Sequence, residues 1–288
     1  MSLKYMVTGA SGQLGALVID GLLASEPASS IGALVRREEA AAPLRAKGVT
    51  VRIADYSDRA ALTEALAGVE RLLLVSSSEV GARATQHQNV IDAAKAAGVG
   101  FVAYTSLLHA ATSPLTVLAG EHVATERALA ASGLHHALLR NGWYTENYAM
   151  GAGSAVQHGA LMGAAGAGRI NSAARADYAA AAVAVLTGTL PASGTVYELA
   201  GDESYDLADF ASAIGSIAGK PVPYRNLDEA QYVTLLQQVG LPQPLAAMLG
   251  NSDTGASQGG LADDSRTLSR LIGRPTTPWR DTLSAALA

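Results

Sequence analysis

The chain has 288 residues, of which 49% are hydrophobic, enough for one large domain or for a nucleotide-binding domain with a smaller lobe. Its 20 Lys and Arg residues against 25 Asp and Glu give a formal net charge of −5. Together with the absence of any basic block, this argues against a nucleic-acid partner. The lack of cysteine excludes disulfides, thiolate metal sites and a cysteine nucleophile.

No apolar run approaches the roughly 20 residues that a membrane-spanning helix needs, so no membrane contact is expected. The N-terminus reaches a strand-like run within a few residues, which leaves no room for a signal peptide and predicts a cytoplasmic protein. The six histidines lack the helical spacing of metal ligands, so no metal site is expected. The sequence leaves the oligomeric state open.

From residue 4 to about residue 140, short β-rich runs alternate with helical patterns rich in Ala and Leu. This alternation is typical of consecutive βαβ units and predicts an α/β fold of the Rossmann type, a doubly wound parallel sheet. Basic residues followed by a glycine stop, in "RAKGV" and "KAAGV", predict two helix-to-strand turns of this winding. The predicted strands are Tyr5–Thr8, Ile31–Val35, Val49–Ala54, Arg71–Val75, Phe101–Tyr104 and His136–Leu139.

After Tyr148 the alternation weakens, and Gly151–Arg175, rich in Gly, Ala and Ser, is predicted to be loop and not core. A strand is predicted at Thr195–Gly201, and the apolar spacing after it predicts a helix that stops at Gly219. The remaining predictions are helices at Gln231–Val239 and Leu261–Ile272, with a flexible connector between them at Asn251–Gly260. We therefore predict a nucleotide-binding domain at 1–150. A smaller, mostly helical substrate-binding lobe follows at 151–288, with strands that return to the main sheet.

Three glycines, Gly9, Gly12 and Gly15, follow the first predicted strand and open the first predicted helix. Glycine in this position lets the backbone approach a pyrophosphate at a helix N-terminus. Three glycines in seven residues also occur in ordinary turns, but the place of this motif in the first βαβ unit predicts a dinucleotide site. The spacing G-x-x-G-x-x-G points to the short-chain dehydrogenase branch of these folds.

The residues at the end of the second predicted strand indicate whether the cofactor is NAD(H) or NADP(H). Enzymes that use NAD carry an acidic residue there for the ribose hydroxyls, whereas this strand ends "ALVRRE" with Arg36 and Arg37. An arginine offers a planar fork to a 2′-phosphate, so NADP(H) is favoured and NAD(H) remains possible. The alternative is that both arginines are a solvated strand end.

Polar residues follow four other predicted strands, whose carboxyl ends should line the same crevice. Asp55 is a candidate acceptor for the adenine amino group, and the backbone of Ser76–Ser78 is expected beside the adenosine ribose. Each run alone is compatible with a simple turn. The runs are "ADYSD", "VSSSE", "YTSLLHA" and "LLRNGWYTEN".

Carbonyl reductases of the short-chain type protonate their product through a Tyr-x-x-x-Lys pair on the helix after the fifth strand. Here that helix reads "LAGEHVATERALAASG" and contains neither residue, which argues against ordinary alcohol dehydrogenase activity. His122 and Glu126 share a helix face and are candidates for an acid/base couple. The alternative interpretation is a surface histidine beside a glutamate.

The runs "TGASGQLG", "LLLVSSSEVGARATQHQNVIDAAKAAGV", "LLRNGWYTENY", "RADYAAAA" and "DDSRTLSRLIGRPTT" resemble the NmrA-like family of atypical short-chain dehydrogenases/reductases. Within it, the chain is similar to the NAD(P)H:quinone oxidoreductase type 2 and to triphenylmethane dye reductases. The resemblance implies hydride transfer to a planar, conjugated acceptor, a quinone or another polycyclic aromatic, without flavin or metal.

The candidate catalytic residues are His122, Glu126 and Tyr144. Three aromatic residues lie close together in the sequence after a predicted strand end, and their rings could stack on a planar acceptor. They are Trp143, Tyr144 and Tyr148. The alternative is that Trp143 only fills the gap between two lobes. The resemblance and the strand ends together give the predicted cofactor positions. They are Thr8, Gly9, Ala10, Ser11, Gly12, Gln13, Leu14, Gly15, Arg36, Asp55, Ser76, Ser77, Ser78, Thr105, Asn141, Gly142, Trp143 and Tyr144.

Three functions follow from these residues and from the resemblance. The first is an NAD(P)H-dependent quinone or aromatic reductase, for which a missing proton donor is tolerable because the acceptor is strongly electrophilic. The second is a redox tailoring enzyme, a reductase or monooxygenase, acting on an aromatic natural product. The third is a dinucleotide-binding redox sensor that regulates a partner without catalysis, as the family's namesake implies.

Overall fold

The computed structural model describes residues 3–79 and 81–288, which form two compact units interleaved along the chain. Unit 1 contains the chain up to Ser106 together with Glu121–Arg140 and Tyr178–Tyr197. Unit 2 contains Leu107–Gly120, Asn141–Asp177 and Glu198–Ala288. The domain boundary expected at residue 150 stays a prediction. Each of the two units consists of several segments, which alternate along the sequence.

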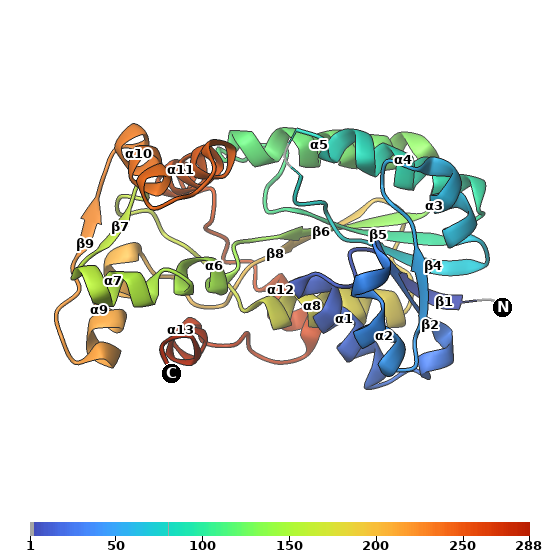
Figure 1. Cartoon of the computed structure of the whole chain (residues 1–288), viewed down its shortest axis with the longest axis horizontal. Helices are drawn as coiled ribbons and strands as arrows, with labels where there is room; N and C mark the ends of the chain where they lie inside the picture. Colours follow the sequence, from blue (N-terminus) through green and yellow to red (C-terminus); the bar gives the residue numbers. More distant parts are fainter. Residues whose placement is uncertain (1–2, 80) are drawn as a thin grey trace. The chain divides into compact units, whose positions relative to one another are not determined.

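A seven-stranded parallel sheet of order β3-β2-β1-β4-β5-β6-β8 forms the frame, so the predicted Rossmann-type α/β fold is confirmed (Figure 1). The amide of Gly194 donates to the carbonyl of His136, and that of Gly142 to Leu199, so β8 runs parallel to β6. All six strands predicted up to residue 140 are present. The strands are β1 Leu3–Val7, β2 Ile31–Val35, β3 Thr50–Ile53, β4 Val69–Leu74, β5 Phe101–Leu107, β6 His136–Asn141 and β8 Thr195–Leu199.

Helices cover both faces of the sheet, with α3, α4 and α5 on one side and α1, α2 and α8 on the other (Figure 1). This double cover explains why β1, β2 and β5 are buried almost throughout and read as continuous apolar runs. The predicted glycine stops are confirmed at Gly48 and Gly98, which have φ of +80° and +72°. The helices are α1 Gln13–Leu23, α2 Ala42–Ala46, α3 Arg59–Leu66, α4 Arg83–Ala96, α5 Thr116–Ser132 and α8 Arg175–Thr187, with 3-10 turns at Ala28–Ser30 and Glu38–Ala40.

Unit 2 consists mainly of helices and a two-stranded parallel sheet of β7 and β9. The helix predicted to stop at Gly219 is confirmed, with Gly219 in the left-handed conformation at φ +67°. The elements are α6 Thr145–Ala149, α7 Ala152–His158, β7 Leu161–Gly163, α9 Leu207–Ala218, β9 Tyr224–Asn226, α10 Glu229–Gln238, α11 Gln243–Ser257, α12 Thr267–Ile272 and α13 Trp279–Leu287.

Two loop predictions in this part of the chain are wrong. Gly151–Arg175 contains α7 and β7, and Ala165, Ile170 and Ala173 in it are fully buried. Some of its small residues lie where neighbouring backbone is close: a Cβ on Gly168 would stand 2.2 Å from the carbonyl oxygen of Ala256. Small size here marks close packing, and not solvent exposure.

The connector predicted at Asn251–Gly260 is largely helix, since α11 continues to Ser257. A Cβ on Gly250 would lie 2.5 Å from a methyl of Val233 in α10, and one on Gly255 would lie 2.7 Å from Leu115. The small residues therefore let α11 approach its neighbours closely. Packing of this kind overrides the low intrinsic helix propensity of glycine.

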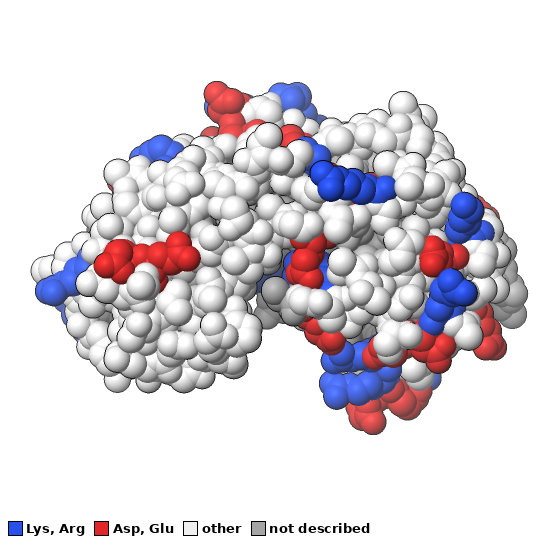
Figure 2. Space-filling view, turned by 90° about the horizontal axis from the view of Figure 1, so that it is seen from above, with Lys and Arg blue, Asp and Glu red and all other residues white. Residues whose placement is uncertain are grey.

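The surface carries charges of both signs. Figure 2 shows one face on which Lys and Arg alternate with Asp and Glu, without an extended basic area among the residues drawn in colour. Within the described ranges, no helix has the length and apolar character needed to cross a bilayer.

Candidate functional site

The glycine turn between β1 and α1 has the geometry of a phosphate-binding turn. Gly9 is left-handed at φ +56°, and Gly12 caps α1 with an extended backbone. The amide of Gly12 donates to the carbonyl of Gly9 at 2.9 Å, and that of Ala10 donates to Leu34 in β2 at 3.2 Å. The turn is therefore fixed to two strands. It directs the first helical turn, whose amides have no acceptor within the helix, at the carboxyl edge of the sheet.

Gly15 is the tightest position of this turn. A Cβ there would lie 2.3 Å from the carbonyl oxygen of Gly9 and 2.9 Å from the Cα of Ala10. The third glycine therefore allows α1 to pack against the end of β1. Of the other predicted positions in the turn, Ser11 and Gln13 are exposed, whereas Thr8, Ala10 and Leu14 are buried.

Side chains from three elements bind the amides after β4. Thr8 Oγ1 accepts from the amide of Val75 at 2.9 Å, and Thr105 Oγ1 accepts from Ser76 at 2.8 Å. His87 Nε2 accepts from Ser77 at 2.9 Å. The structure thus brings Thr8, Thr105 and the serine run together in unit 1, as the strand-end argument predicts.

His87 was missed by the sequence reasoning, because nothing in α4 distinguishes it from a surface histidine. Its Nδ1 lies 2.9 Å from Thr125 Oγ1, so the hydroxyl accepts from Nδ1–H while Nε2 accepts from the amide of Ser77. Burial, with a smaller contribution from Arg83, lowers the pKa of His87 to about 3. The ring is therefore neutral at physiological pH and remains an acceptor for the loop.

Arg36 directly follows β2 and is half-exposed, as its predicted role requires. Its guanidinium pairs with Glu79 at 2.5 Å and lies 4.0 Å from Asp55. Asp55 also accepts from the amide and hydroxyl of Ser57, and these bonds hold its pKa below the ordinary value. Arg36, Asp55 and Glu79 therefore form one charged cluster after β2, the strand that lies next to β1 and its glycine turn.

His122 and Glu126 do not form the predicted couple, because each binds a different partner. The Nδ1 of His122 lies 2.7 Å from the hydroxyl of Tyr104, and burial lowers its pKa to about 3. Glu126 accepts two hydrogen bonds from Arg140, at 2.8 and 2.7 Å, and one from Ser106 at 2.6 Å. Both residues are under 10% exposed, so the alternative of a surface pair is also wrong.

The predicted positions after β6 lie in unit 2. The carbonyl of Asn141 accepts from the amide of Leu108, and the amide of Gly142 donates to Leu199 in β8. Asn141 Nδ2 donates to the hydroxyl of Tyr144 at 3.4 Å. The buried Oδ1 of Asn141 accepts no hydrogen bond from the described residues, so this amide has an acceptor available for a ligand.

Trp143 and Tyr148 belong to a larger aromatic cluster in unit 2. Their ring centroids lie 6.2 Å apart, and Tyr148 lies 6.0 Å from Phe210. The sequence reasoning missed Phe210, Tyr205 and Trp279, which come from distant segments and stack at 4.5 to 5.6 Å. Tyr144 instead stacks under Arg175, whose guanidinium carbon is 4.7 Å from the ring centre.

Asp253 lies buried beneath this cluster. It accepts from the hydroxyl of Tyr148 and from the amide of Ala164, both at 2.9 Å. Burial raises its pKa from the ordinary 3.8 to about 6, although both hydrogen bonds act in the opposite direction. The carboxyl group therefore changes its charge close to physiological pH.

We expect Asp253→Asn to change how stability depends on pH. The native pKa exceeds the unfolded one, so this group's contribution to stability is present below pH 4 and is lost as pH rises through 6. At about 1.4 kcal/mol per pKa unit, the loss is about 3 kcal/mol. We expect the free energy of unfolding of the variant, measured with urea, to rise by this amount relative to that of the wild type between pH 4 and pH 7. A difference that stays constant with pH would contradict the assignment.

Within the described ranges, no group of three His, Asp or Glu side chains is arranged to hold a metal ion. The candidate residues for a ligand are the glycine turn and the charged cluster of unit 1, and Asn141 and the aromatic cluster of unit 2.

Comparison with known proteins decides the family. Residues 9–189 match the sequence model of the NAD(P)H-binding family. The chain belongs to this family. The chain is also 58% identical to Quinone oxidoreductase 2 of Escherichia coli, over 96% of each chain. These matches confirm the NmrA-like assignment.

Solved structures agree with this assignment over the whole length. The NADPH-dependent quinone oxidoreductase QOR2 of Escherichia coli, complexed with NADPH, superposes with a TM-score of 0.95 at 57% identity, covering 99% of this chain and all of that one. Triphenylmethane reductase of Citrobacter sp., complexed with NADP(H), gives 0.93 at 35% identity, covering 98% of this chain and all of that one. The proteins to which this chain is similar therefore include a quinone oxidoreductase and a triphenylmethane reductase.

Proposed function

We propose that this protein transfers a hydride from NADPH to a quinone or a similarly planar, electrophilic acceptor. The observation that carries the proposal is the 58% identity to Quinone oxidoreductase 2 over 96% of both chains. The glycine turn supports it physically, since its backbone is fixed in the conformation that admits a pyrophosphate. The cofactor supplies the hydride when it is bound.

The residues proposed to hold NADPH lie mostly in unit 1. The amides of Ser11, Gln13 and Leu14 would bind the pyrophosphate, and Arg36 the 2′-phosphate. Asp55, Thr105 and Ser76–Ser78 would shape the adenosine side. In unit 2, Asn141 would offer its buried carbonyl oxygen to an amide donor. These roles remain proposals that substitution can test one by one.

The acceptor is proposed to contact Trp143 and Tyr148. Flat conjugated molecules bind well to aromatic side chains, and few polar groups are needed to orient them. The helix α5 lacks the Tyr-x-x-x-Lys pair, so acceptors that need strong activation of a carbonyl are poor candidates. Quinones and cationic dyes accept a hydride readily once it is close and aligned.

A turnover assay tests this function. We expect oxidation of NADPH, followed by its absorbance, with simple quinones such as menadione and with cationic triphenylmethane dyes. Tight binding of NADPH without turnover on any acceptor would overturn the proposal and would favour a sensor that only binds the dinucleotide.

The cofactor preference has its own prediction. Replacing Arg36 by Ala should lower kcat/KM for NADPH about 10- to 100-fold and leave NADH unchanged, because a charged, bidentate contact to the 2′-phosphate is worth roughly 1.5–3 kcal/mol. Arg37→Ala is the matched control, since Arg37 is exposed and adjoins Arg36. Equal use of NADH and NADPH by the wild type would show that Arg36 only pairs with Glu79.

A further inference from the structure

His109 is held in an unusual backbone conformation in the turn that follows β5. Its φ of +53° is left-handed, which a residue with a side chain adopts at a cost of about 1 kcal/mol or more. The amide of His109 donates to Glu198 Oε2 at 2.8 Å, and its carbonyl accepts from the amide of Thr112 at 2.8 Å. The surrounding structure therefore fixes this strained residue on both sides.

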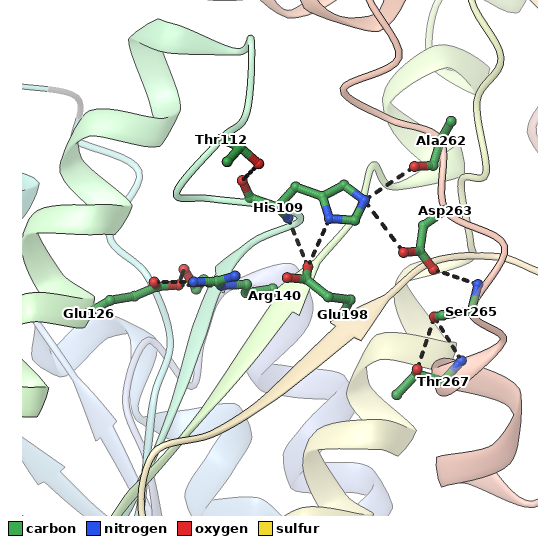
Figure 3. A network of polar contacts seen from close by, with 10 residues as sticks. His109, Thr112, Glu126, Arg140, Glu198, Ala262, Asp263, Ser265 and Thr267 are labelled. Carbon is green, nitrogen blue, oxygen red and sulfur yellow. Dashed lines mark hydrogen bonds and ion pairs between the residues drawn. The ribbon is translucent and has the colours of Figure 1, made fainter.

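The imidazole of His109 lies between two carboxylates of unit 2, as Figure 3 shows. Nδ1 is 3.7 Å from Glu198 Oε2 on β8, and Nε2 is 3.4 Å from Asp263 Oδ2. Nε2 also faces the carbonyl of Ala262 at 3.3 Å. Asp263 is itself oriented, since its Oδ1 accepts from the amide of Ser265 at 3.0 Å.

Each of these contacts offers the ring an acceptor, so the doubly protonated form can donate on both sides. The contacts are long, which leaves an N–H able to turn to a ligand, and catalytic hydrogen bonds are often loose before the substrate binds. His109 is one-third exposed, so the ring is open to solvent and to a bound molecule.

The position of His109 fits a role at the ligand. It follows the carboxyl end of β5, the edge at which doubly wound sheets bind ligands. The preceding amide, of Leu108, donates to Asn141 at 2.9 Å, which joins this loop to the turn that carries Trp143. All these residues belong to unit 2.

The tyrosines of the same unit are poor proton donors. Burial raises the pKa of Tyr144, Tyr148 and Tyr205 above the ordinary value, and the hydroxyl of Tyr148 already donates to Asp253. Asp253 is itself only 3% exposed. His109 carries an N–H and reaches solvent, so it is the better candidate for a proton donor.

We propose that His109 donates the proton that a quinone needs as it accepts the hydride, with Glu198 and Asp263 positioning the ring. This inference rests on the proposed function. The C–H bond of the reduced nicotinamide breaks, and its electron pair moves with the hydrogen to one carbonyl oxygen of the quinone, so that negative charge develops on the other oxygen. In the same transition state an N–H of His109 breaks and its proton bonds to that second oxygen, which gives the hydroquinone. The neutral imidazole then regains a proton from solvent.

The chemistry of the acceptor provides a sharp test. A cationic triphenylmethane dye becomes neutral on accepting a hydride and needs no proton, whereas a quinone needs one. For His109→Asn we expect kcat/KM for menadione to fall roughly 10²- to 10⁴-fold, the usual contribution of a general acid. Reduction of malachite green should be unchanged. Asparagine tolerates the left-handed conformation, so the loop is expected to fold.

Two further readouts separate proton donation from a structural role. Binding of NADP⁺, measured by calorimetry, should be the same in His109→Asn as in the wild type. The pH profile of menadione reduction should fall at alkaline pH in the wild type and be flat in the variant. The matched control is His158→Asn, because His158 is exposed at the end of α7 and should change neither acceptor.

The outcomes are distinct. Equal losses with menadione and the dye, or weaker binding of NADP⁺, would show that His109 only holds the loop and would overturn the inference. An unchanged rate with menadione, or an unchanged pH profile, would also overturn it. No turnover by the wild type would instead defeat the proposed function, before any variant is compared.

Discussion

Substituting Gly15 by Ala is expected to abolish productive NADPH binding. The new Cβ would stand 2.3 Å from the carbonyl oxygen of Gly9 and 2.9 Å from the Cα of Ala10, and both are backbone atoms that cannot rotate away. The start of α1 must therefore move off the end of β1 and carry the phosphate-binding amides with it. A displacement near 1 Å typically costs about 100-fold, so we expect KM for NADPH to rise by at least that factor.

The measurement is NADPH binding by fluorescence, alongside urea unfolding. Overpacking of this kind should also lower the free energy of unfolding by about 1–3 kcal/mol. Gly120→Ala is the control: it lies inside α5, no atom comes within 4 Å of its added Cβ, and a gain of up to about 1 kcal/mol is expected. Wild-type affinity in Gly15→Ala would mean that the turn does not bind the pyrophosphate.

The frame of this fold could be predicted because its determinants are local. The predicted bounds of β2, Ile31–Val35, agree with the structure, since the strand is a continuous buried apolar run. The stops at Gly48 and Gly98 follow from the left-handed conformation that glycine adopts after a helix. Alternation of such signals is enough to predict a doubly wound sheet.

The helix α11 could not be predicted in the same way, because its stability depends on distant segments. The segment "NSDTGAS" at the end of α11 has low helix propensity, and contacts of α11 with distant residues such as Val233, Leu115 and Tyr148 favour the helix. A pattern of small residues indicates close packing only when the partner is known. The sequence pattern therefore predicts a loop where the packed structure has a helix.

The residues of the candidate site differ in the same way: some are recognisable from their neighbours in the sequence, and others depend on distant residues. The glycine turn and Arg36 are recognisable because strand, turn and helix follow one another in the sequence. His109, by contrast, gains its significance from Glu198, which is 89 residues away, and Asp253 from Tyr148, which is 105 residues away. Such pairs form only when the chain folds, so single residues in the sequence do not distinguish them from surface positions.

Glu126→Ala is the second prediction with a large effect, and it concerns stability. The side chain of Glu126 is 10% exposed, and it binds Arg140, 16% exposed, through two hydrogen bonds. Truncating Glu126 takes the carboxylate away from a guanidinium that remains largely buried. Breaking a buried pair in this way costs about 3–5 kcal/mol. Urea unfolding of the whole protein, followed by circular dichroism, should show this loss in the free energy of unfolding.

The double variant Glu126→Leu with Arg140→Met tells whether the loss comes from the charge left behind. Removing both members leaves no buried charge from this pair, so stability should return toward that of the wild type. A structural ion pair also predicts that kcat per folded molecule of Glu126→Ala stays near the wild-type value. If kcat collapsed while the free energy of unfolding held, Glu126 would be a catalytic group after all. The contacts with Arg140 and Ser106 argue against that outcome, because they occupy both carboxylate oxygens.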